Sequence, residues 1–561
     1  MKMIIRFCAL VIIYSLATQQ GGACTNLLIT KGASADGSAM ISYNADSHTL
    51  YGELYYKPAK DYPKGTLMDI YDWDSTKYLG KIRQAIHTYS VVGNINEHQV
   101  AIGETTFGGR DGLVDYSASL DYGSLIYITL QRAATARAAI DTMASLTHDY
   151  GYHSEGESFS ISDPNEVWIM EVVGKGSPEI IKDKKGKIIK TKYNKGVVWV
   201  ARRIPDGFIC AHANQSRIRQ FPLNDTENCK YSKDVITFAR EKGWYKGEDK
   251  DFSFADTYAP LTFEGVRFCE GRVYSMFRRA APSLNLSADF VKGVDGAEPL
   301  PLWVKPDKKL SVKDAMALMR DHYEGTDLDM TKDIGGGQFH CPYRWRPLTW
   351  KVDSIEYFNE RAISTQQTGF TFIAQSRSWL PDFVGGVIWF GVDDSYSTVY
   401  VPMYCSMTEI PESYAVGNGD FFNYSETSAF WTFNFVSNWA YTRYSDMIVD
   451  IQKVQKELED KFIAFQPAVE KAAMELYNNN NSSLAIKYLN DYSVNQAEIT
   501  THRWKKLGHE LLVKYMDGNV KDDKGNVIHP PYPQWWYKSI IDETGDHFKV
   551  KKLKSEVEKT H

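Results

Sequence analysis

The stretch that decides the fold begins at Cys24 and reads CTNLLITKGASADGSAMISYNAD, residues 24–46. Two short apolar runs in this stretch flank a cluster of turn-forming residues at 32–37, which contains an Asp-Gly pair. Apolar runs on both sides of an Asp-Gly pair are typical of a β-hairpin. We therefore expect two antiparallel strands, the second of which returns Asp46 to a position close to Cys24.

The residues that precede Cys24 have the pattern of a secretory leader. Lys2 and Arg6 supply a basic start, residues 7–17 are almost wholly apolar, and small or polar residues follow. The apolar run is shorter than the roughly 20 residues that a membrane span needs, so we expect a cleaved leader and not a permanent anchor. Small residues stand one and three positions before Cys24, as signal peptidase requires, so cleavage after Ala23 makes Cys24 the first residue of the mature protein.

Composition and charge narrow the classes of function. The chain has 561 residues and a net charge of −6, which is ample length for a core in one large domain or in two lobes. It has no basic stripe with interleaved aromatic residues, so nucleic acid is not an expected partner. None of the seven cysteines forms a C-x-x-C pair, which argues against a zinc knuckle or a thioredoxin-like redox site.

The order of the expected elements indicates an α+β chain. Strand-like runs dominate the first hundred residues, a helical stretch follows at 122–147, and further strand pairs are expected between 158 and 212. Residues 363–404 return to strands, and apolar residues at three- and four-residue spacing predict long helices over 444–515. Strands, a helix and then more strands are typical of a layered α+β domain, in contrast to regularly alternating βαβ units.

A cysteine at a mature N-terminus can supply a nucleophile and its base from one residue. Its α-amine has a pKa of about 8, lies within reach of the sulfur and can accept the thiol proton. Cys24 is therefore the candidate nucleophile, and no separate catalytic histidine is required. An alternative interpretation is the acylated cysteine of a bacterial lipoprotein, although such signals prefer a bulky apolar residue three positions before the cysteine, where this chain has Gly21.

Seven short motifs are distributed in order over some four hundred residues of the chain. They are Cys24-Thr25-Asn26, Ala35-Asp36-Gly37-Ser38, Asn44-Ala45-Asp46-Ser47, Ala213-Asn214-Gln215-Ser216-Arg217-Ile218, His322-Tyr323-Glu324-Gly325-Thr326, Pro342-Tyr343-Arg344-Trp345-Arg346-Pro347 and Ser364-Thr365-Gln366-Gln367-Thr368. Together they resemble the cysteine dipeptidase family (dipeptidase A type) of the N-terminal-nucleophile hydrolases, which is related to penicillin V acylase and bile salt hydrolase. The resemblance runs from Cys24 to about Lys456.

The resemblance implies an α+β fold with four layers, αββα, in which two antiparallel sheets lie between helices and Cys24 starts a central strand. We expect three parts: a cleaved signal peptide at 1–23, the hydrolase domain at 24–435, and a helical C-terminal extension with a charged tail at 436–561. The protein is then expected to be exported, and to be periplasmic or secreted.

Asp46 is the residue that the resemblance assigns to the α-amine of Cys24. A carboxylate there would orient the amine and stabilise its protonated form after it accepts the thiol proton. In the acylase relatives an arginine stands three positions before this aspartate, but here that place is Tyr43. Either an arginine from elsewhere in the chain replaces it, or the site lacks one.

Three further site residues follow from the resemblance. Asn214, just after an expected strand, matches the asparagine that binds the oxyanion of the tetrahedral intermediate, for which a side-chain amide is a standard donor. Arg272 lies where the relatives carry an arginine beside the nucleophile, where it would favour the thiolate, and Arg278 and Arg279 are nearby competitors. Thr105 corresponds to a polar residue in the wall of the substrate site.

The activity implied is the hydrolysis of dipeptides through a thioester at Cys24. Small peptides are the expected partners, without nucleic acid and without a stable membrane span. No metal and no cofactor are expected, because thiol chemistry needs neither and the His and Asp residues at 322–329 lack the spacing of a metal site. Two alternatives stay open: an amidase of the same superfamily that acts on N-acyl amino acids or bile-salt-like conjugates, and a non-catalytic, peptide-binding lipoprotein acylated at Cys24.

Overall fold

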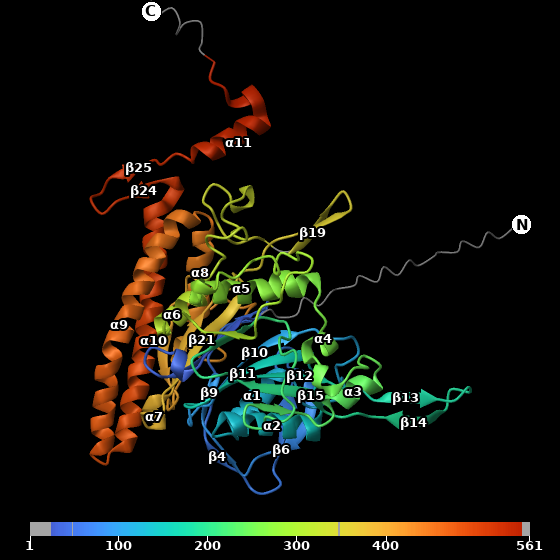
Figure 1. The fold of residues 1–561 in the computed structure, drawn as a ribbon. Coiled ribbons are helices and arrows are strands. Elements are labelled where there is room, and N and C mark those ends of the chain that lie inside the picture. Colours follow the sequence, from blue (N-terminus) through green and yellow to red (C-terminus); the bar gives the residue numbers. More distant parts are fainter. Residues whose placement is uncertain (1–23, 48, 346–347, 552–561) are drawn as a thin grey trace, which may run out of the picture.

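The computed structural model describes residues 24–47, 49–345 and 348–551, and the expected leader at 1–23 lies outside the described residues. Two antiparallel sheets form the centre of the molecule (Figure 1). The strand order of the seven-stranded sheet is β18 (Trp303–Val304), β16 (Ile209–His212), β1 (Asn26–Ile29), β2 (Ala39–Asp46), β21 (Thr368–Ser376), β22 (Val387–Val392), β23 (Val401–Tyr404). The strand order of the eight-stranded sheet is β17 (Cys229–Tyr231), β15 (Val197–Arg203), β12 (Val167–Gly174), β11 (Gly156–Ser162), β10 (Ala101–Phe107), β9 (Ile95–Asn96), β8 (Val91–Val92), β3 (Tyr56–Lys57).

The hairpin predicted from the first stretch of sequence is confirmed. β1 and β2 are antiparallel neighbours, with Leu28 opposite Ile41, and β2 then pairs along its length with β21. The main chains of Thr25 and Asn44 exchange two hydrogen bonds, with N···O distances of 3.1 and 2.9 Å. These bonds fix the residue after Cys24 against the end of β2, next to Asp46.

Helices cover the outer sides of both sheets, while β2 of the first sheet faces β10, β11 and β12 of the second. The eight-stranded sheet is covered by α1 (Tyr122–Leu130) and α2 (Ala136–Tyr150). The other sheet contacts α5 (Gly271–Ala280) and α6 (Val312–Leu318), and its β22–β23 end contacts α8 (Ala429–Tyr441), α9 (Tyr444–Asn478) and α10 (Ser482–Tyr515). The chain is therefore a mixed α+β protein with a helical C-terminal region.

The helical stretch predicted at 122–147 consists of two helices. α1 ends at Leu130, and the break runs to Thr135, whose extended backbone (φ −146°, ψ 160°) directly precedes α2. The Thr135 hydroxyl accepts a hydrogen bond from the N–H of Ala138 at 3.1 Å and so caps the start of α2. The sequence prediction was wrong in joining the two helices, because the alanine-rich pattern continues through this region and a single capping threonine does not interrupt it.

The long helices predicted over 444–515 are confirmed as α9 and α10. A buried ion pair joins α9 to the sheet region: Arg320 donates to the two carboxylate oxygens of Glu459 at 3.0 and 2.5 Å, and Glu459 also accepts from the N–H of Tyr400 at 3.0 Å. The expected boundary at 435/436 falls inside α8, and side chains of α8, α9 and α10 share one apolar core with both sheets.

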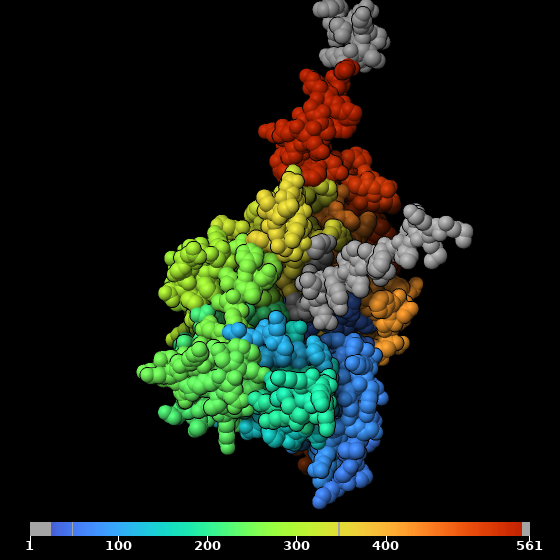
Figure 2. Space-filling model, turned by 90° about the vertical axis from the view of Figure 1, so that its right-hand side faces the viewer, coloured from blue at the N-terminus to red at the C-terminus, as the bar shows by residue number. Residues whose placement is uncertain are grey.

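Beyond α10 the chain leaves the body of the molecule, as Figures 1 and 2 show. This last part contains the short strands β24 (Val520–Lys521) and β25 (Val527–Ile528) and the helix α11 (Gln534–Thr544), which has no buried residue. Within residues 24–47, 49–345 and 348–551, no helix combines the length and the apolar character that crossing a membrane requires.

One polar side chain, His212, links the two sheets in the interior. Its Nδ1 lies 2.7 Å from the hydroxyl of Thr105, and its Nε2 lies 2.7 Å from the hydroxyl of Ser160. The imidazole is fully buried, and burial, with the nearby charge of Arg217, lowers the pKa of His212 to about 3. The folded protein therefore holds this imidazole in its neutral form.

The neutral His212 predicts a loss of stability in acid. Because the pKa is lower in the folded state than the value of about 6.5 in the unfolded chain, the unfolded state binds the extra proton as the pH falls below about 6.5. Between pH 7 and pH 4 the wild type should lose about 3 kcal/mol of unfolding free energy more than His212→Gln, which keeps a polar group there but does not titrate. Urea unfolding of both proteins at the two pH values measures this difference, and equal losses would contradict it.

Candidate active site

Cys24 lies directly before β1, an inner strand of the seven-stranded sheet, and its side chain is buried. Its Sγ lies 3.4 Å from the hydroxyl of Tyr43 and 3.6 Å from Oε1 of Glu104. The Tyr43 hydroxyl in turn donates to the same oxygen of Glu104. Sulfur, phenol and carboxyl thus form a closed hydrogen-bonded triangle.

The thiol opens onto a cavity of about 550 Å³. Besides Cys24, the cavity is lined by tyrosines, serines and threonines, by the apolar side chains of Leu50, Trp73 and Val114, by one histidine and by six carboxyl side chains. The carboxyl side chains are those of Asp46, Asp72, Asp74, Glu104, Glu155 and Glu157. Among the described residues that line this cavity there is no lysine and no arginine, so its wall is strongly acidic.

The surroundings of Cys24 disfavour a thiolate. Burial raises the pKa of the Cys24 thiol well above its usual value, and the charges of Glu104 and Asp46 raise it further, against a smaller opposite effect of the Tyr43 hydrogen bond. The thiol is therefore neutral near pH 7 and needs a base close to its sulfur before it can act as a nucleophile.

Close packing of the two sheets holds Cys24 in this place. Gly103 in β10 faces β1 and β2, and a Cβ atom added to it would lie 2.8 Å from Nδ2 of Asn26 and 3.4 Å from Cβ of Tyr43. Any other residue at 103 would push β10 away from the strand that carries the nucleophile. The distance from Glu104 to the Cys24 sulfur depends on this glycine.

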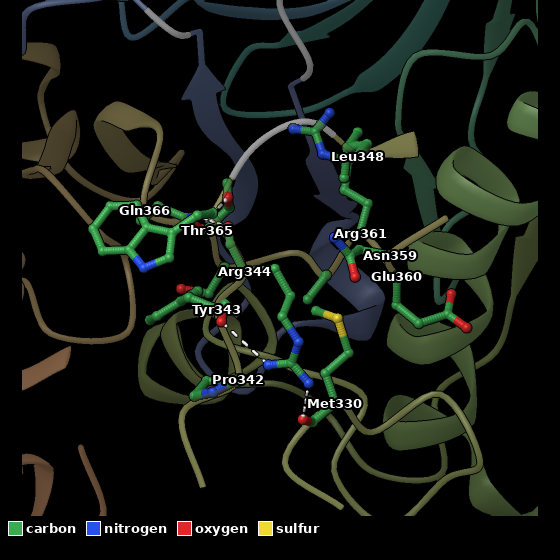
Figure 3. A pocket seen from close by; sticks show the side chains of 13 residues that line it. Met330, Pro342, Tyr343, Arg344, Leu348, Asn359, Glu360, Arg361, Thr365 and Gln366 are labelled. Carbon is green, nitrogen blue, oxygen red and sulfur yellow. Dashed lines mark hydrogen bonds between the residues drawn. The ribbon is translucent and has the colours of Figure 1, made fainter. Parts of the chain in front are cut away.

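Asp46 ends β2 and is buried beside Cys24. One carboxylate oxygen accepts from Nη2 of Arg361 at 3.0 Å, and the other accepts from the hydroxyl of Thr368 at 2.7 Å. Arg361 is thus an arginine from elsewhere in the chain beside this aspartate, 315 positions away in the sequence. Arg361 also lines a smaller neighbouring pocket, where Arg344 donates to the carbonyl oxygens of Tyr343 and Met330 (Figure 3).

Arg272 comes from α5 and is fully buried. Its Nη1 donates to the carbonyl oxygen of Cys24 at 2.6 Å and to the hydroxyl of Thr25 at 2.7 Å. These contacts place the guanidinium at the main chain of the nucleophile, not at its sulfur. Of the two competitors, Arg278 donates to the carbonyl of Glu324 and Arg279 to the carboxylate of the buried Asp321, and among the described residues neither is hydrogen-bonded to Cys24.

Asn214 follows β16 and lies beside Arg272. Its Oδ1 accepts from Nη2 of Arg272 at 2.9 Å, and its Nδ2 donates to the carbonyl oxygen of Thr106 at 2.6 Å. Its backbone has a φ of 59°, a left-handed conformation that asparagine tolerates better than most residues. The structure therefore brings Cys24, Arg272 and Asn214 together through one chain of hydrogen bonds.

Thr105 points away from the cavity. Successive side chains of a strand alternate between the two faces of a sheet, and Thr105 faces the other sheet, where it contacts His212. Glu104 and Thr106 project from the opposite face, and both line the cavity. The resemblance assigned the wall position to Thr105, whereas the structure places the next residue, Thr106, in the cavity wall.

Sequence reasoning missed Tyr43, Glu104, Glu157 and Arg361. Tyr43 and Glu104 lie inside strands, where a polar side chain within an apolar run is the signal that was available. No local signal identifies Arg361, because its partner Asp46 is distant in the sequence. Across the described ranges, no group of three or more His, Cys, Asp or Glu side chains is arranged to hold a metal ion.

Curated proteins with similar sequences carry the name dipeptidase. The chain is 25% identical over 412 residues to a probable dipeptidase of Latilactobacillus sakei, a match that covers 70% of this chain and 76% of the relative. It is 24% identical over 406 residues to a probable dipeptidase of Salmonella dublin, covering 69% and 81%. It is 22% identical over 511 residues to probable dipeptidase B of Streptococcus pyogenes serotype M1, covering 87% and 93%.

A family model matches most of the chain. The model of peptidase family C69 covers residues 23–60 and 53–457. These limits agree with the resemblance expected from Cys24 to about Lys456, which is thereby confirmed. The chain belongs to peptidase family C69 and is a peptide hydrolase.

Proposed function

We propose that the protein is an exported dipeptidase in which Cys24, as the first residue of the mature chain, attacks the peptide bond. The observation that carries this proposal is the place of the Cys24 sulfur: it is buried at the wall of a 550 Å³ cavity, between Tyr43 and Glu104 and next to Asp46. Relatives named probable dipeptidases support the substrate class.

The fold that we propose is the four-layer αββα sandwich of N-terminal-nucleophile hydrolases. Two facing antiparallel sheets with helices on their outer sides support it, as does the inner position of β1. The proposal keeps a signal peptide at 1–23 and a hydrolase domain that begins at Cys24. The expected limit between 24–435 and 436–561 is not kept, because it falls inside α8 and the helices α8 to α10 share the core of the sheets. Removal of the signal peptide would accompany export to the periplasm or the medium.

The proposed mechanism is acyl transfer with the α-amine of Cys24 as base. The amine takes the thiol proton, the sulfur attacks the carbonyl carbon, and Asn214 donates to the oxyanion. The C–N bond then breaks, the proton passes from the α-ammonium to the leaving amine, and a thioester remains. Water, deprotonated by the same amine, adds to the thioester and releases the acid and the thiol.

The charges of the site fit this division of roles. Asp46, held by Arg361 and Thr368, would accept a hydrogen bond from the α-amine and stabilise the ammonium formed in each step. Arg272 would hold the carbonyl oxygen of Cys24, and so fix the nitrogen and the sulfur of that residue relative to the cavity. Carboxylates that raise the pKa of the thiol would favour an adjacent ammonium, so the ammonium formed when the proton moves from sulfur to nitrogen would offset the repulsion between the thiolate and the carboxylates.

Both alternatives fit the geometry less well. An amidase for N-acyl amino acids or bile-salt-like conjugates would have to place an uncharged or apolar acyl group in a cavity that has six carboxyl side chains and few apolar ones, Leu50, Trp73 and Val114. An acylated lipoprotein cysteine has to reach a membrane surface, whereas Cys24 is 5% exposed. These observations favour the dipeptidase.

Replacing the nucleophile tests the proposal directly. Cys24→Ala should lower kcat for dipeptides by roughly 1,000-fold or more, and Cys24→Ser should also be strongly impaired, because a hydroxyl is far less acidic than a thiol. Near-UV circular dichroism should match the wild type. A dipeptide panel measures the rates, and Cys229→Ala, which changes another buried cysteine outside the cavity, is the matched control. Undiminished turnover in Cys24→Ala would disprove the mechanism.

The role of the α-amine predicts that one extra residue before Cys24 inactivates the enzyme. A peptide nitrogen cannot accept a proton near neutral pH, so the extended form should fold but turn over at least about 100-fold more slowly. Removal of the extra residue by an aminopeptidase should restore the rate. The two forms are compared at equal folded concentration, and equal rates would show that the α-amine is not the base.

A further inference from the structure

Two glutamates form a buried carboxyl pair in the cavity beside Cys24. Glu104 lies in β10 and Glu157 in β11, and the register pairs Thr106 with Glu157. Alternation along β10 therefore puts Glu104, Thr106 and Glu157 on one face of the sheet. Glu104 is 1% exposed and Glu157 is 0% exposed, yet both line the cavity.

The pair has hydrogen-bond donors on one side but no positive charge. The hydroxyl of Thr106 donates to Oε1 of Glu157 at 2.9 Å, and Tyr43 donates to Glu104. Oε2 of Glu157 is buried and has no hydrogen-bond partner within the described part of the chain. Buried polar atoms are rarely left in this state, so an unsatisfied acceptor at a cavity wall points to a ligand that donates to it.

Electrostatics favours a cationic ligand. Burial, and then the charge of Glu104, raise the pKa of Glu157 well above its usual value, and burial also raises the pKa of Glu104. Two buried carboxylates in contact cannot both ionise unless a cation neutralises them. Without a ligand, the hydrogen bond between the two carboxyl groups lets the pair hold one proton in place of a cation. No lysine or arginine is found among the described residues of the cavity wall, so a cationic ligand could take the place of that proton.

The distance to the nucleophile identifies which cation fits. In a dipeptide the α-nitrogen and the carbonyl carbon of the first residue are separated by one Cα atom, and so lie about 2.5 Å apart. At attack the carbonyl carbon lies about 3 to 3.5 Å from the sulfur, which places the ammonium within about 6 Å of Sγ. Oε1 of Glu104 lies 3.6 Å from Sγ of Cys24, so this carboxyl group is close enough to contact an ammonium at that distance from the sulfur.

We propose that the Glu104–Glu157 pair binds the protonated α-amino group of the substrate, so that the enzyme cleaves only after an unblocked first residue. This proposal rests on the proposed dipeptidase function and adds the group that the cavity recognises. A second residue on the amino side would replace the ammonium by an uncharged amide, which leaves the carboxyl pair without its cation. The carboxyl pair thereby limits the acyl side of the substrate to one residue.

The first test compares Ala-Ala with propanoyl-alanine, which has the same shape and the same scissile bond but lacks the amino group. The wild type should cleave Ala-Ala with a kcat/KM at least about 100-fold higher, because the analogue leaves the buried carboxyls unpaired. Calorimetric binding of both compounds to Cys24→Ala gives the same comparison without turnover. Equal kcat/KM values, or equal affinities, would overturn the proposal.

The second test removes one charge of the pair. Glu157→Gln should raise KM for Ala-Ala about 10-fold or more, leave kcat within about threefold, and reduce the discrimination against propanoyl-alanine. Glu53→Gln, the same exchange at a half-buried glutamate outside the cavity, is the matched control and should change neither. The rate at which iodoacetamide labels Cys24 should be equal in all three proteins, which shows that the nucleophile is intact.

The outcomes separate this proposal from the function on which it rests. If Cys24→Ala keeps full turnover of Ala-Ala, the proposed function fails, while the ratio of kcat/KM for Ala-Ala and propanoyl-alanine in the wild type and in Glu157→Gln still decides the role of the carboxyl pair. If turnover depends on Cys24 but Glu157→Gln has the KM and selectivity of the wild type, the function stands and the carboxyl pair is not the receptor. If Glu157→Gln does not fold, the two compounds measured on the wild type give the decision alone.

Discussion

The site depends on one electrostatic constraint: a thiol and several carboxyl groups are buried together around a single cavity. Desolvation disfavours the charged form of each of these groups, so each needs a positive charge or a proton. The protein places fixed guanidinium groups on one side only, with Arg361 at Asp46 and Arg272 at the carbonyl oxygen of Cys24. On the other side, Glu104 and Glu157 face the cavity without such a partner among the described residues. On the proposal made above, this uneven distribution of cations would make the cavity selective for a positively charged ligand.

Hydrogen bonds between paired strands and from a buried arginine fix the position of Cys24. The two bonds between Thr25 and Asn44 fix the chain one residue after Cys24, and Arg272 fixes the carbonyl oxygen of Cys24 itself. Arg272 is held in turn by Asn214 and by the carbonyl of Phe268. Elements from β2, α5 and the end of β16 therefore converge on one residue. A shift of any of them moves the sulfur relative to the cavity, and reaction rates are sensitive to displacements of about 1 Å.

Local patterns predicted the parts of this structure that local interactions determine. The hairpin around the Asp-Gly pair and the helices over 444–515 follow from turn chemistry and apolar spacing. The break at Thr135 was missed because a single cap competes with a strongly helical pattern. The partnership of Asp46 with Arg361 has no local signal, since only the pairing of β2 with β21 and its flanking loop brings them together. The assignment of Thr105 shows a related limit. Resemblance to a family motif identifies the segment that lines a site, but the alternation of side chains along the strand decides whether Thr105 or its neighbours Glu104 and Thr106 face the cavity.

An enzyme that uses its own α-amine as base and acts on substrates with a free amino group faces two amines in one cavity. Both are cations in part of the cycle, and a single carboxylate site would bind either. The structure separates two acidic positions: Asp46 is held at the end of β2 by Arg361 and Thr368, and the Glu104–Glu157 pair lies across the sulfur on β10 and β11. Asp46 already has a guanidinium, so it would stabilise the α-ammonium less than an unpaired carboxylate would, which suits a base that has to give up its proton in each step. The glutamate pair has no such partner among the described residues, so a cation there gains the full benefit of neutralising buried charge. The same difference in charge that separates the two amines would place the substrate carbonyl between them, in front of the sulfur.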